Sequence, residues 1–187
     1  MKKYLLPSIK ITVACLVLFA GIYPLLIAAV GKLAPGGGDG EKVMVNGKVV
    51  GYANIGQKFT ADKYFWGRPS AVDYNAAGSG GSNKGPSNPD YLKTVQDRID
   101  TFLVHNPGVE KNEIPAELVT ASGSGLDPDI SPEGAYVQIT RVAAARKMPA
   151  AAVRQLVDAS IRKPLLGMLG PSKVNVLKLN VALDKLK

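Results

Sequence analysis

The 187-residue chain is 46% hydrophobic and 20% charged, which is typical of a folding chain and limits it to about one ordinary domain plus an accessory segment. Its 23 Lys and Arg against 15 Asp and Glu give a formal net charge of +8. Aromatic residues make up only 6% and no basic run exceeds a pair, so a nucleic-acid partner is not favoured. One Cys and one His exclude an intrachain disulfide framework and zinc sites of the Cys/His type.

An uncharged apolar run near the amino terminus indicates a membrane helix. It extends over Ile11–Val30, and twenty helical residues span roughly 30 Å, the thickness of a bilayer's hydrocarbon core. Basic residues precede the run at Lys2, Lys3 and Lys10, whereas Lys32 is the only one close behind it. By the positive-inside rule the amino terminus is cytoplasmic and the bulk of the chain is extracytoplasmic. The predicted location is the cell (inner) membrane, with a single pass.

The alternative to a retained anchor is a cleaved signal peptide. Ala29-Val30-Gly31 offers the small residues that a signal peptidase inspects. However, the apolar region of a signal peptide is usually roughly 7 to 15 residues long, so the length of this run favours retention. The predicted order is a cytoplasmic amino terminus (1–10), a transmembrane helix (11–31), a linker (32–42) and one extracytoplasmic domain (43–187).

Turn residues divide the rest of the chain into a mixed set of elements. Two apolar runs flank Asn46-Gly47, the dipeptide that best tolerates a type I′ turn, and predict a hairpin that continues to about Ile55. Residues 67–89 are so rich in Gly, Ser, Asn and Pro that they predict a long surface loop.

Three helices and a final strand are predicted after this loop. Apolar spacing over Leu92–Leu103 gives the first helix, Ser131-Pro132 begins the second and Pro149 begins the third. Val174, Val176, Leu177 and Leu179 fit a short strand before a basic tail. Strand, helices and strand in one domain predict an α+β or mixed α/β fold.

Two stretches invite a catalytic or ligand-binding interpretation, and each has a simpler one. Gly78–Gly85 lacks the Gly-Lys-Ser/Thr ending and the preceding strand of a phosphate-binding loop, so a structured surface loop is favoured. Asp127 and Asp129 could bind a cation, but Pro132 and Gly134 interrupt the register of an EF-hand. Oxygens in that stretch are therefore expected to accept hydrogen bonds from backbone donors in turns.

His105 is the one residue that could serve as the base of a Ser-His-Asp triad. It ends the first predicted helix, and no nucleophile-elbow spacing surrounds any Ser of the chain. The favoured interpretation is a helix-end residue. No catalytic residue and no metal site are predicted.

The segment Tyr64-Phe65-Trp66-Gly67-Arg68-Pro69-Ser70 gathers three aromatic residues before an Arg. Trp, Tyr and Arg contribute much of the binding energy at protein interfaces, so Trp66 and Arg68 are candidates for contact with a partner. Phe65 is expected in the core. Cation–π stacking of Arg68 on a ring is the alternative that keeps the segment at the edge of the core.

Several blocks of sequence resemble the C subunit of Kdp-type potassium-transporting ATPases, the KdpC family, in the same order over nearly the whole chain. The resemblance lies in Tyr23-Pro24-Leu25, Tyr64 to Ser70 (with Tyr64, Phe65, Gly67 and Pro69), Gly80-Gly81-Ser82-Asn83, Ser87-Asn88-Pro89, Glu117-Leu118-Val119-Thr120-Ala121-Ser122, Gly125-Leu126-Asp127, Gln138-Ile139, Arg141-Val142-Ala143 and Leu179-Asn180-Val181-Ala182-Leu183-Asp184. Asn83 joins Trp66 and Arg68 as a candidate for partner contact. Thr140 stands where that family's pattern has Pro.

The resemblance implies a non-catalytic accessory subunit of a high-affinity, ATP-driven potassium uptake complex. The implied partners are a potassium-channel-like subunit, the P-type ATPase subunit and a small single-span subunit, together with the membrane and no nucleic acid. No covalently bound cofactor is implied, while ATP and K⁺ act at the level of the complex. The family is described as a catalytic chaperone that raises the ATP affinity of the ATPase subunit.

An extracytoplasmic domain cannot contact cytoplasmic ATP. It could still act by allosteric coupling or by capping the potassium entrance, and the second is our hypothesis: the domain sits over the channel-like subunit. Two other classes stay open: a membrane-anchored extracytoplasmic binding domain independent of a pump, and a secreted hydrolase that depends on His105.

Overall fold

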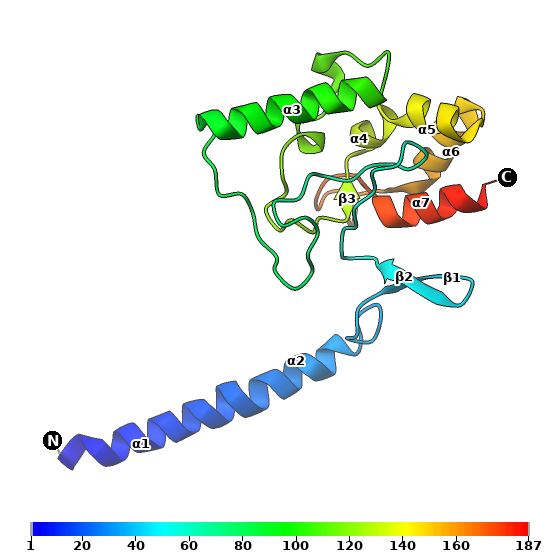
Figure 1. Cartoon of the computed structure of the whole chain (residues 1–187). Coiled ribbons are helices and arrows are strands. Elements are labelled where there is room, and N and C mark those ends of the chain that lie inside the picture. The colour runs from blue at the N-terminus through cyan, green and yellow to red at the C-terminus, as the bar shows by residue number, and fades with distance from the viewer. Residues whose placement is uncertain (1, 187) are drawn as a thin grey trace. The chain divides into compact units, whose positions relative to one another are not determined.

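The computed structural model describes residues 2–186, which divide into two compact units with the boundary in the chain between Lys42 and Val43 (Figure 1). The first unit is an apolar helix with a glycine-rich segment after it. The second is a mixed helical and sheet fold.

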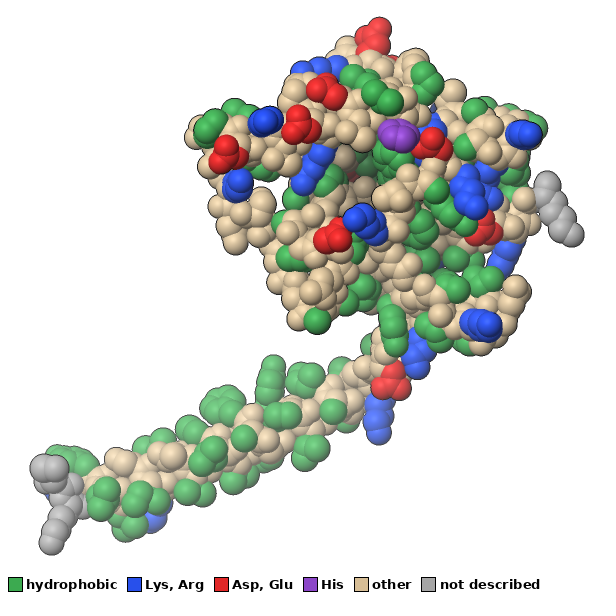
Figure 2. All heavy atoms as spheres, in the orientation of Figure 1, with side chains coloured by type: hydrophobic (Ala, Val, Ile, Leu, Met, Phe, Trp, Pro, Cys, Tyr) green, Lys and Arg blue, Asp and Glu red, His purple; other side chains and the backbone are tan. Residues whose placement is uncertain are grey.

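The first unit is a continuous helix made of α1 (Lys2–Leu16), a π-helical turn η1 (Val17–Ile22) and α2 (Tyr23–Gly31). From Lys3 to Gly31 it is long and apolar enough to cross a membrane. Hydrophobic side chains line its length (Figure 2). The helix begins earlier than the uncharged run, because Lys3 and Lys10 are also helical.

The π-helical turn has a physical cause in the proline that follows it. Pro24 has no backbone N–H for the carbonyl four residues before it, and its ring crowds that carbonyl. The backbone N–H of Tyr23 instead donates to the carbonyl oxygen of Leu18, five residues back. The wider turn lets the helix continue past Pro24, which lies in the first turn of α2.

The second unit begins with the predicted hairpin, β1 (Lys42–Val45) paired with β2 (Lys48–Tyr52). Asn46 and Gly47 connect them with φ angles of 49° and 77°. Positive φ at both central residues is the mark of a type I′ turn, so this prediction is confirmed.

Residues 67–88 contain no helix or strand, as predicted, and α3 (Pro89–His105) follows them. The Asn88 side chain caps α3 by accepting a hydrogen bond from the backbone N–H of Tyr91 at 3.0 Å. Two short 3₁₀ helices that the sequence did not indicate, η2 (Lys111–Glu113) and η3 (Ala116–Leu118), come next.

A small antiparallel sheet organises the carboxyl-terminal half. Its strands β3 (Asp129–Ile130), β4 (Ile161–Arg162) and β5 (Lys173–Asn175) lie in the order β3-β5-β4. The helices α4 (Pro132–Tyr136), α5 (Ile139–Arg146) and α6 (Ala150–Ser160) connect β3 to β4, and α7 (Val176–Lys185) follows β5. The mixed α and β class is thereby confirmed.

The prediction of a strand through Leu179 was wrong beyond Asn175. The Asn175 side chain accepts from the backbone N–H of Lys178 at 3.0 Å and so caps a helix at that point. The buried residues of α7 recur at helical spacing: Val176, Leu177, Leu179, Asn180 and Leu183. The capping signal of Asn175 therefore outweighs the β-branched residues beside it.

The second predicted helix is divided into α4 and α5. Ser131 caps α4 as expected, since its Oγ accepts from the N–H of Gly134 at 2.9 Å. The break comes at Gln138, whose buried amide donates to the Gly134 carbonyl oxygen at 2.8 Å. At this break the Gln138 side chain faces the aromatic segment Tyr64–Trp66 and accepts a hydrogen bond from the Trp66 N–H.

Candidate functional site

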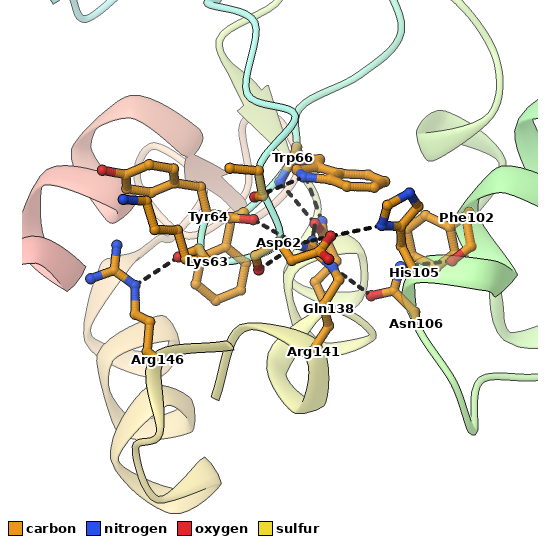
Figure 3. A network of polar contacts seen from close by, with 12 residues as sticks. Asp62, Lys63, Tyr64, Trp66, Phe102, His105, Asn106, Gln138, Arg141 and Arg146 are labelled. Carbon is orange, nitrogen blue, oxygen red and sulfur yellow. Dashed lines mark hydrogen bonds and ion pairs between the residues drawn. The ribbon is translucent and has the colours of Figure 1, made fainter. Parts of the chain in front are cut away.

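The aromatic segment Tyr64–Trp66 is an irregular stretch whose backbone is held by two amide side chains, and Figure 3 shows Gln138 beside Trp66. Asn180 accepts from the Phe65 N–H at 2.8 Å and donates to the Phe65 carbonyl oxygen at 2.9 Å. Gln138 does the same for Trp66, at 2.8 Å and 3.2 Å. Two amides therefore satisfy backbone groups that no sheet partner reaches.

The Phe65 ring is fully buried in the main core, as predicted. That core also contains Phe102 of α3, Val142 of α5, Val157 of α6 and Leu179 of α7. Burial of a Phe side chain contributes roughly 1.5–3 kcal/mol. The ring thus anchors the centre of the segment while its neighbours remain near the surface.

Arg141 is the hub of the network in Figure 3, with a side chain only 3% exposed. Its Nη1 donates to the carbonyl oxygens of Asp62 at 2.7 Å and of Tyr64 at 2.9 Å. Its Nε donates to Asn106 Oδ1 at 3.0 Å, and its Nη2 to Gln138 Oε1 at 2.7 Å. Burial lowers the pKa of Arg141 to about 10, an effect that the Asp62 carboxylate opposes.

Trp66 lies half-buried between this hub and α3. The Arg141 guanidinium carbon is 4.3 Å from the Trp66 ring centroid, a cation–π distance. On the α3 side, the ring centroids of Trp66 and His105 are 5.0 Å apart and those of Trp66 and Phe102 are 6.5 Å apart. The indole is therefore fixed on both sides.

His105 pairs with Asp62, with 2.8 Å between Nδ1 and Oδ1, and both side chains are partly exposed. In the described part of the chain no Ser hydroxyl bonds to His105. It is a helix-end residue that joins α3 to the aromatic segment, and the arrangement lacks the nucleophile that a triad needs.

Arg68 pairs with Asp127 at 3.0 Å, and among the described residues its guanidinium stacks on no aromatic ring, which was the alternative to partner contact. Its carbonyl oxygen accepts a hydrogen bond from the Tyr74 hydroxyl. Its Nε is buried and has no hydrogen-bond partner within residues 2–186. Burial raises the pKa of Tyr74 to about 12, and the nearby Asp127 adds to that effect.

The glycine-rich stretch is a structured loop that packs against residues 122–127. Gly80 N–H donates to the Ser124 carbonyl oxygen at 2.9 Å, and Ser122 N–H donates to the Pro69 carbonyl oxygen at 3.0 Å. Asn83 has a φ of 53° and an exposed side chain, and no hydrogen bond joins it to the described network. The prediction of a structured surface loop holds, and Asn83 lies apart from Trp66 and Arg68 in this network.

The two aspartates that could have bound a cation, Asp127 and Asp129, instead bond to basic side chains and a backbone N–H of the protein. Asp127 bonds to Arg68 and accepts from the Asp129 N–H at 3.1 Å. Asp129 pairs with Arg162 at 3.1 Å and with Lys173 at 2.6 Å. Across residues 2–186 no three His, Cys, Asp or Glu side chains gather in a way that could hold a metal ion.

A cavity of about 520 Å³ opens beside the aromatic segment. Its lining includes Phe59, Trp66, Arg68, Tyr74, Arg98 and His105. Aromatic rings with a few charged groups make a surface suited to contact with another molecule. We call it the Trp66 cavity.

The network includes residues that the sequence alone did not single out for this role. Asp62 and Asn106 join it only through the fold, over separations such as the 79 positions between Asp62 and Arg141, and Tyr74 bonds to the Arg68 carbonyl oxygen beside it. Asn180 stood in a motif block, but no local pattern showed that its amide would hold Phe65. Of the motif residues, Gln138 and Arg141 bond directly to the aromatic segment or its neighbours.

Comparisons with known proteins agree on one family. A family model described as K⁺-transporting ATPase, c chain, matches residues 5–185. The chain is 61% identical to a potassium-transporting ATPase KdpC subunit from Flavobacterium psychrophilum, over 99% of this chain and 100% of that protein. A KdpC subunit from Bacteroides fragilis is 56% identical, over 99% and 98% of the two chains. One from Janthinobacterium is 46% identical, over 99% and 100%.

Proposed function

The chain belongs to the KdpC family of potassium-transporting ATPase subunits, and we propose that its folded unit stands outside the cytoplasm and docks over the subunit that takes up potassium. Its part in the pump is that of an accessory subunit, not a catalytic one. The proposed partners are a potassium-channel-like subunit, the P-type ATPase subunit and a small single-span subunit. ATP and K⁺ act through these partners.

The docking proposal depends on one observation: contacts on several sides hold Trp66 in a fixed position. The Trp66 backbone is fixed by Gln138, and its ring lies against Arg141 and His105. A surface that is already rigid loses less conformational entropy when a partner binds. Trp66 and Arg68 beside the Trp66 cavity are therefore a prepared contact site, with an aromatic side chain and an Arg of the kind that interfaces use.

The same contacts argue against a catalysed reaction at this site. The polar groups of Gln138, Arg141 and Asn180 are used to bond protein backbone or neighbouring side chains. Groups engaged in this way hold the fold together and leave no activated nucleophile beside His105. This supports a role in positioning and assembly.

The helix supports the proposed orientation. Lys2, Lys3 and Lys10 lie at its amino end, and Lys32 follows its carboxyl end. The excess of positive charge before the helix favours a cytoplasmic amino terminus. The folded unit would then be extracytoplasmic and able to cap the potassium entrance.

A catalytic-chaperone role can operate from outside the cytoplasm by linkage. A subunit that binds one conformation of the pump more tightly shifts the pump towards that conformation, and with it the affinity for ATP. Linkage is reciprocal, so ATP must strengthen the binding of this chain by the same factor. No residue of this chain needs to contact nucleotide.

The docking proposal is tested by crosslinking from position 66 in assembled complexes in native membranes. A photo-crosslinking residue at Trp66 is expected to trap the channel-like subunit. The same probe at Val104, an exposed position on α3, is the matched control. Contacts only with a cytoplasmic nucleotide-binding domain would overturn the proposal.

Copurification separates this proposal from a free-standing binding domain. The tagged full chain, extracted in detergent, is expected to bring down the other pump subunits, and Trp66→Ala is expected to weaken their recovery while Val104→Ala leaves it unchanged. Recovery of the chain alone would favour the independent anchored domain. A non-hydrolysable ATP analogue should increase the recovery if the linkage holds, and an unchanged recovery would argue against the chaperone role.

A further inference from the structure

The connection between β4 and β5 carries an exposed cluster of large aliphatic side chains. Leu165, Leu166, Met168 and Leu169 are between 60% and 80% exposed. We call residues 164–170 the apolar turn. Elsewhere in the second unit the other exposed large apolar side chains are at most 54% exposed, apart from the single Val104 on α3. Four such side chains within five positions make a contiguous patch of the kind that marks an interaction site.

The backbone of the apolar turn is held by hydrogen bonds, so the exposure of its aliphatic side chains follows from the fold. Leu165 and Leu169 exchange hydrogen bonds, with N–H to carbonyl oxygen distances of 3.0 Å and 2.9 Å. Gly167 N–H donates to the Pro164 carbonyl oxygen at 3.0 Å. Leu166 has a φ of 55°, a conformation that few non-glycine residues adopt. The fold therefore holds aliphatic side chains in the solvent at a site where a polar residue such as Asn would suit the backbone better.

Positive charge borders the apolar turn. Arg162 and Lys163 precede it, Lys173 follows it, and residues 162–173 contain no Asp or Glu. Asp129 forms ion pairs with Arg162 and Lys173, while Lys163 has no ion-pair partner among the described residues. The cavity beside Leu165 and Leu169 is also lined by Arg68, Glu117 and Asp127, so four basic side chains face three carboxylates there. The balance remains positive, which complements an anionic surface.

The composition of the turn fits a lipid surface better than a protein surface. Protein interfaces depend mainly on Trp, Tyr and Arg at their centres, whereas this patch has only Leu and Met at its centre. Aliphatic side chains beside Lys and Arg are the pattern of segments that enter the boundary between lipid headgroups and acyl chains.

A bilayer is also always within reach of the second unit. The eleven residues 32–42 that follow the apolar helix extend to at most roughly 40 Å. We propose that the apolar turn inserts into the interface of an anionic bilayer, so that the chain contacts the membrane at a second place besides its helix. This inference rests on the part of the proposed function in which that helix spans the membrane.

The test uses the full chain with Cys15→Ala in lipid vesicles. Leu166→Cys or Met168→Cys carries an environment-sensitive dye, and lipids with a nitroxide near the headgroup end of the acyl chain act as quenchers. Val104→Cys, equally exposed but on α3, is the matched control. In vesicles that contain phosphatidylglycerol we expect quenching at 166 and 168 to exceed that at 104 by about twofold or more. Neutral vesicles and high salt should reduce the difference.

A charge variant tests the recognition of anionic lipid separately. Lys163→Gln should reduce the difference between anionic and neutral vesicles, because one of the basic side chains beside the turn loses its charge, whereas Lys93→Gln, an exposed lysine on α3, should preserve it. Far-UV circular dichroism of each variant checks that the fold is retained.

Two results would overturn the inference. The first is equal quenching at 166, 168 and 104 in anionic vesicles. The second is a label that is unquenched by lipid and becomes shielded only when the pump subunits are added, because the turn would then bind a protein. Copurification keeps this test distinct from that of the proposed function: a chain that copurifies with the pump but is not quenched refutes only the lipid contact.

Discussion

Arg141 connects parts of the chain that are remote in sequence, and it does so through four donated hydrogen bonds. Replacing it by Met keeps most of the volume of the stem but leaves buried acceptors without donors. We expect Arg141→Met to lower the free energy of unfolding by about 3–5 kcal/mol, because breaking a buried charged network exposes the full desolvation cost of the groups left behind. Urea unfolding of the purified full chain in detergent, followed by near-UV circular dichroism, measures this.

Arg154 is the matched control for that substitution. It is exposed on α6, with its guanidinium carbon 4.7 Å from the Tyr136 ring centroid. An exposed cation–π contact contributes only about 0.5–1 kcal/mol, so Arg154→Met should destabilise by less than about 1 kcal/mol. Equal losses for the two substitutions would show that the Arg141 network contributes nothing beyond the contacts of an ordinary surface arginine.

Tyr74 gives the folded chain a dependence on alkaline pH. Burial raises its pKa from 10.0 to about 12 in the folded state. A group whose pKa is raised by folding stabilises the protein below its unfolded pKa and loses that contribution as the pH rises through the folded value. The contribution of Tyr74 to the free energy of unfolding should therefore fall between about pH 10 and pH 12, and Tyr74→Phe should remove that fall from the pH dependence. Urea unfolding at a series of pH values measures both slopes.

Tyr52→Phe is the corresponding control, since Tyr52 is exposed on β2. It removes one phenol without touching the bond between Tyr74 and the Arg68 carbonyl oxygen. The slope of this variant should match that of the wild-type chain. A Tyr74→Phe variant with the wild-type slope would mean that other groups produce the alkaline loss.

At the scale of elements, the contact between the long loop and residues 122–127 depends on glycine. Gly125 has a φ of +69°, and a Cβ there would lie 2.5 Å from Val72 Cγ2 and 2.8 Å from the Gly80 carbonyl oxygen. Strain and overlap together should make Gly125→Ala cost about 2–4 kcal/mol. Thermal unfolding is the measurement.

Gly85→Ala is the control, because it replaces a glycine of the long loop that residues 122–127 contact. A Cβ at Gly85 meets nothing within 4 Å, and its φ is not in the left-handed region. The expected change is within about 0.5 kcal/mol. If Gly125→Ala were as harmless as Gly85→Ala, the loop would not pack against residues 122–127 in solution.

Elements with strong local signals could be predicted from the sequence. The Asn46-Gly47 turn, the Ser131 cap and the glycine-rich loop each depend on nearby backbone chemistry. The strand predicted through Leu179 was wrong because the Asn175 cap and the burial of α7 outweigh the strand preference of Val174 and Val176. The strands β3 and β4 have two residues each and are strands only because they pair with β5, so no local sequence pattern predicts them.

For the whole molecule, the orientation of the chain is a prediction with a direct readout. With tags at both ends, we expect one polypeptide that keeps both tags, because a helix of this length is retained as an anchor. In intact spheroplasts external protease should remove the carboxyl-terminal tag and leave the amino-terminal tag, since the positive charge before the helix stays inside. Immunoblots of the two tags report the result.

Lysed spheroplasts are the control, in which both tags become accessible. Loss of the amino-terminal tag before any protease is added would indicate a cleaved signal peptide. Protection of the carboxyl-terminal tag until lysis would place the folded unit in the cytoplasm, and both the docking proposal and its topology would then be wrong.

The candidate site was only partly open to prediction. Trp66 and Arg68 stood out because aromatic and arginine residues are rare in this chain and adjacent there. Sequence cannot show that Gln138 and Asn180 would use their amides on the backbone of that segment, because such bonds join positions 72 and 115 residues apart. The separation of Asn83 from the hydrogen-bonded network is likewise a result of how the loop folds.

The amino-acid sequence by itself determined the apolar helix, the mixed α and β class, the turns and caps, and the family, because each depends on composition, on local backbone chemistry or on motifs in order. Only the tertiary structure decided which polar side chains meet around Trp66, where the strand after Lys173 becomes a helix, and that Leu165 to Leu169 remain uncovered. These outcomes depend on burial and on contacts between distant segments. Such contacts form, and contribute to the free energy of folding, only once the chain has folded.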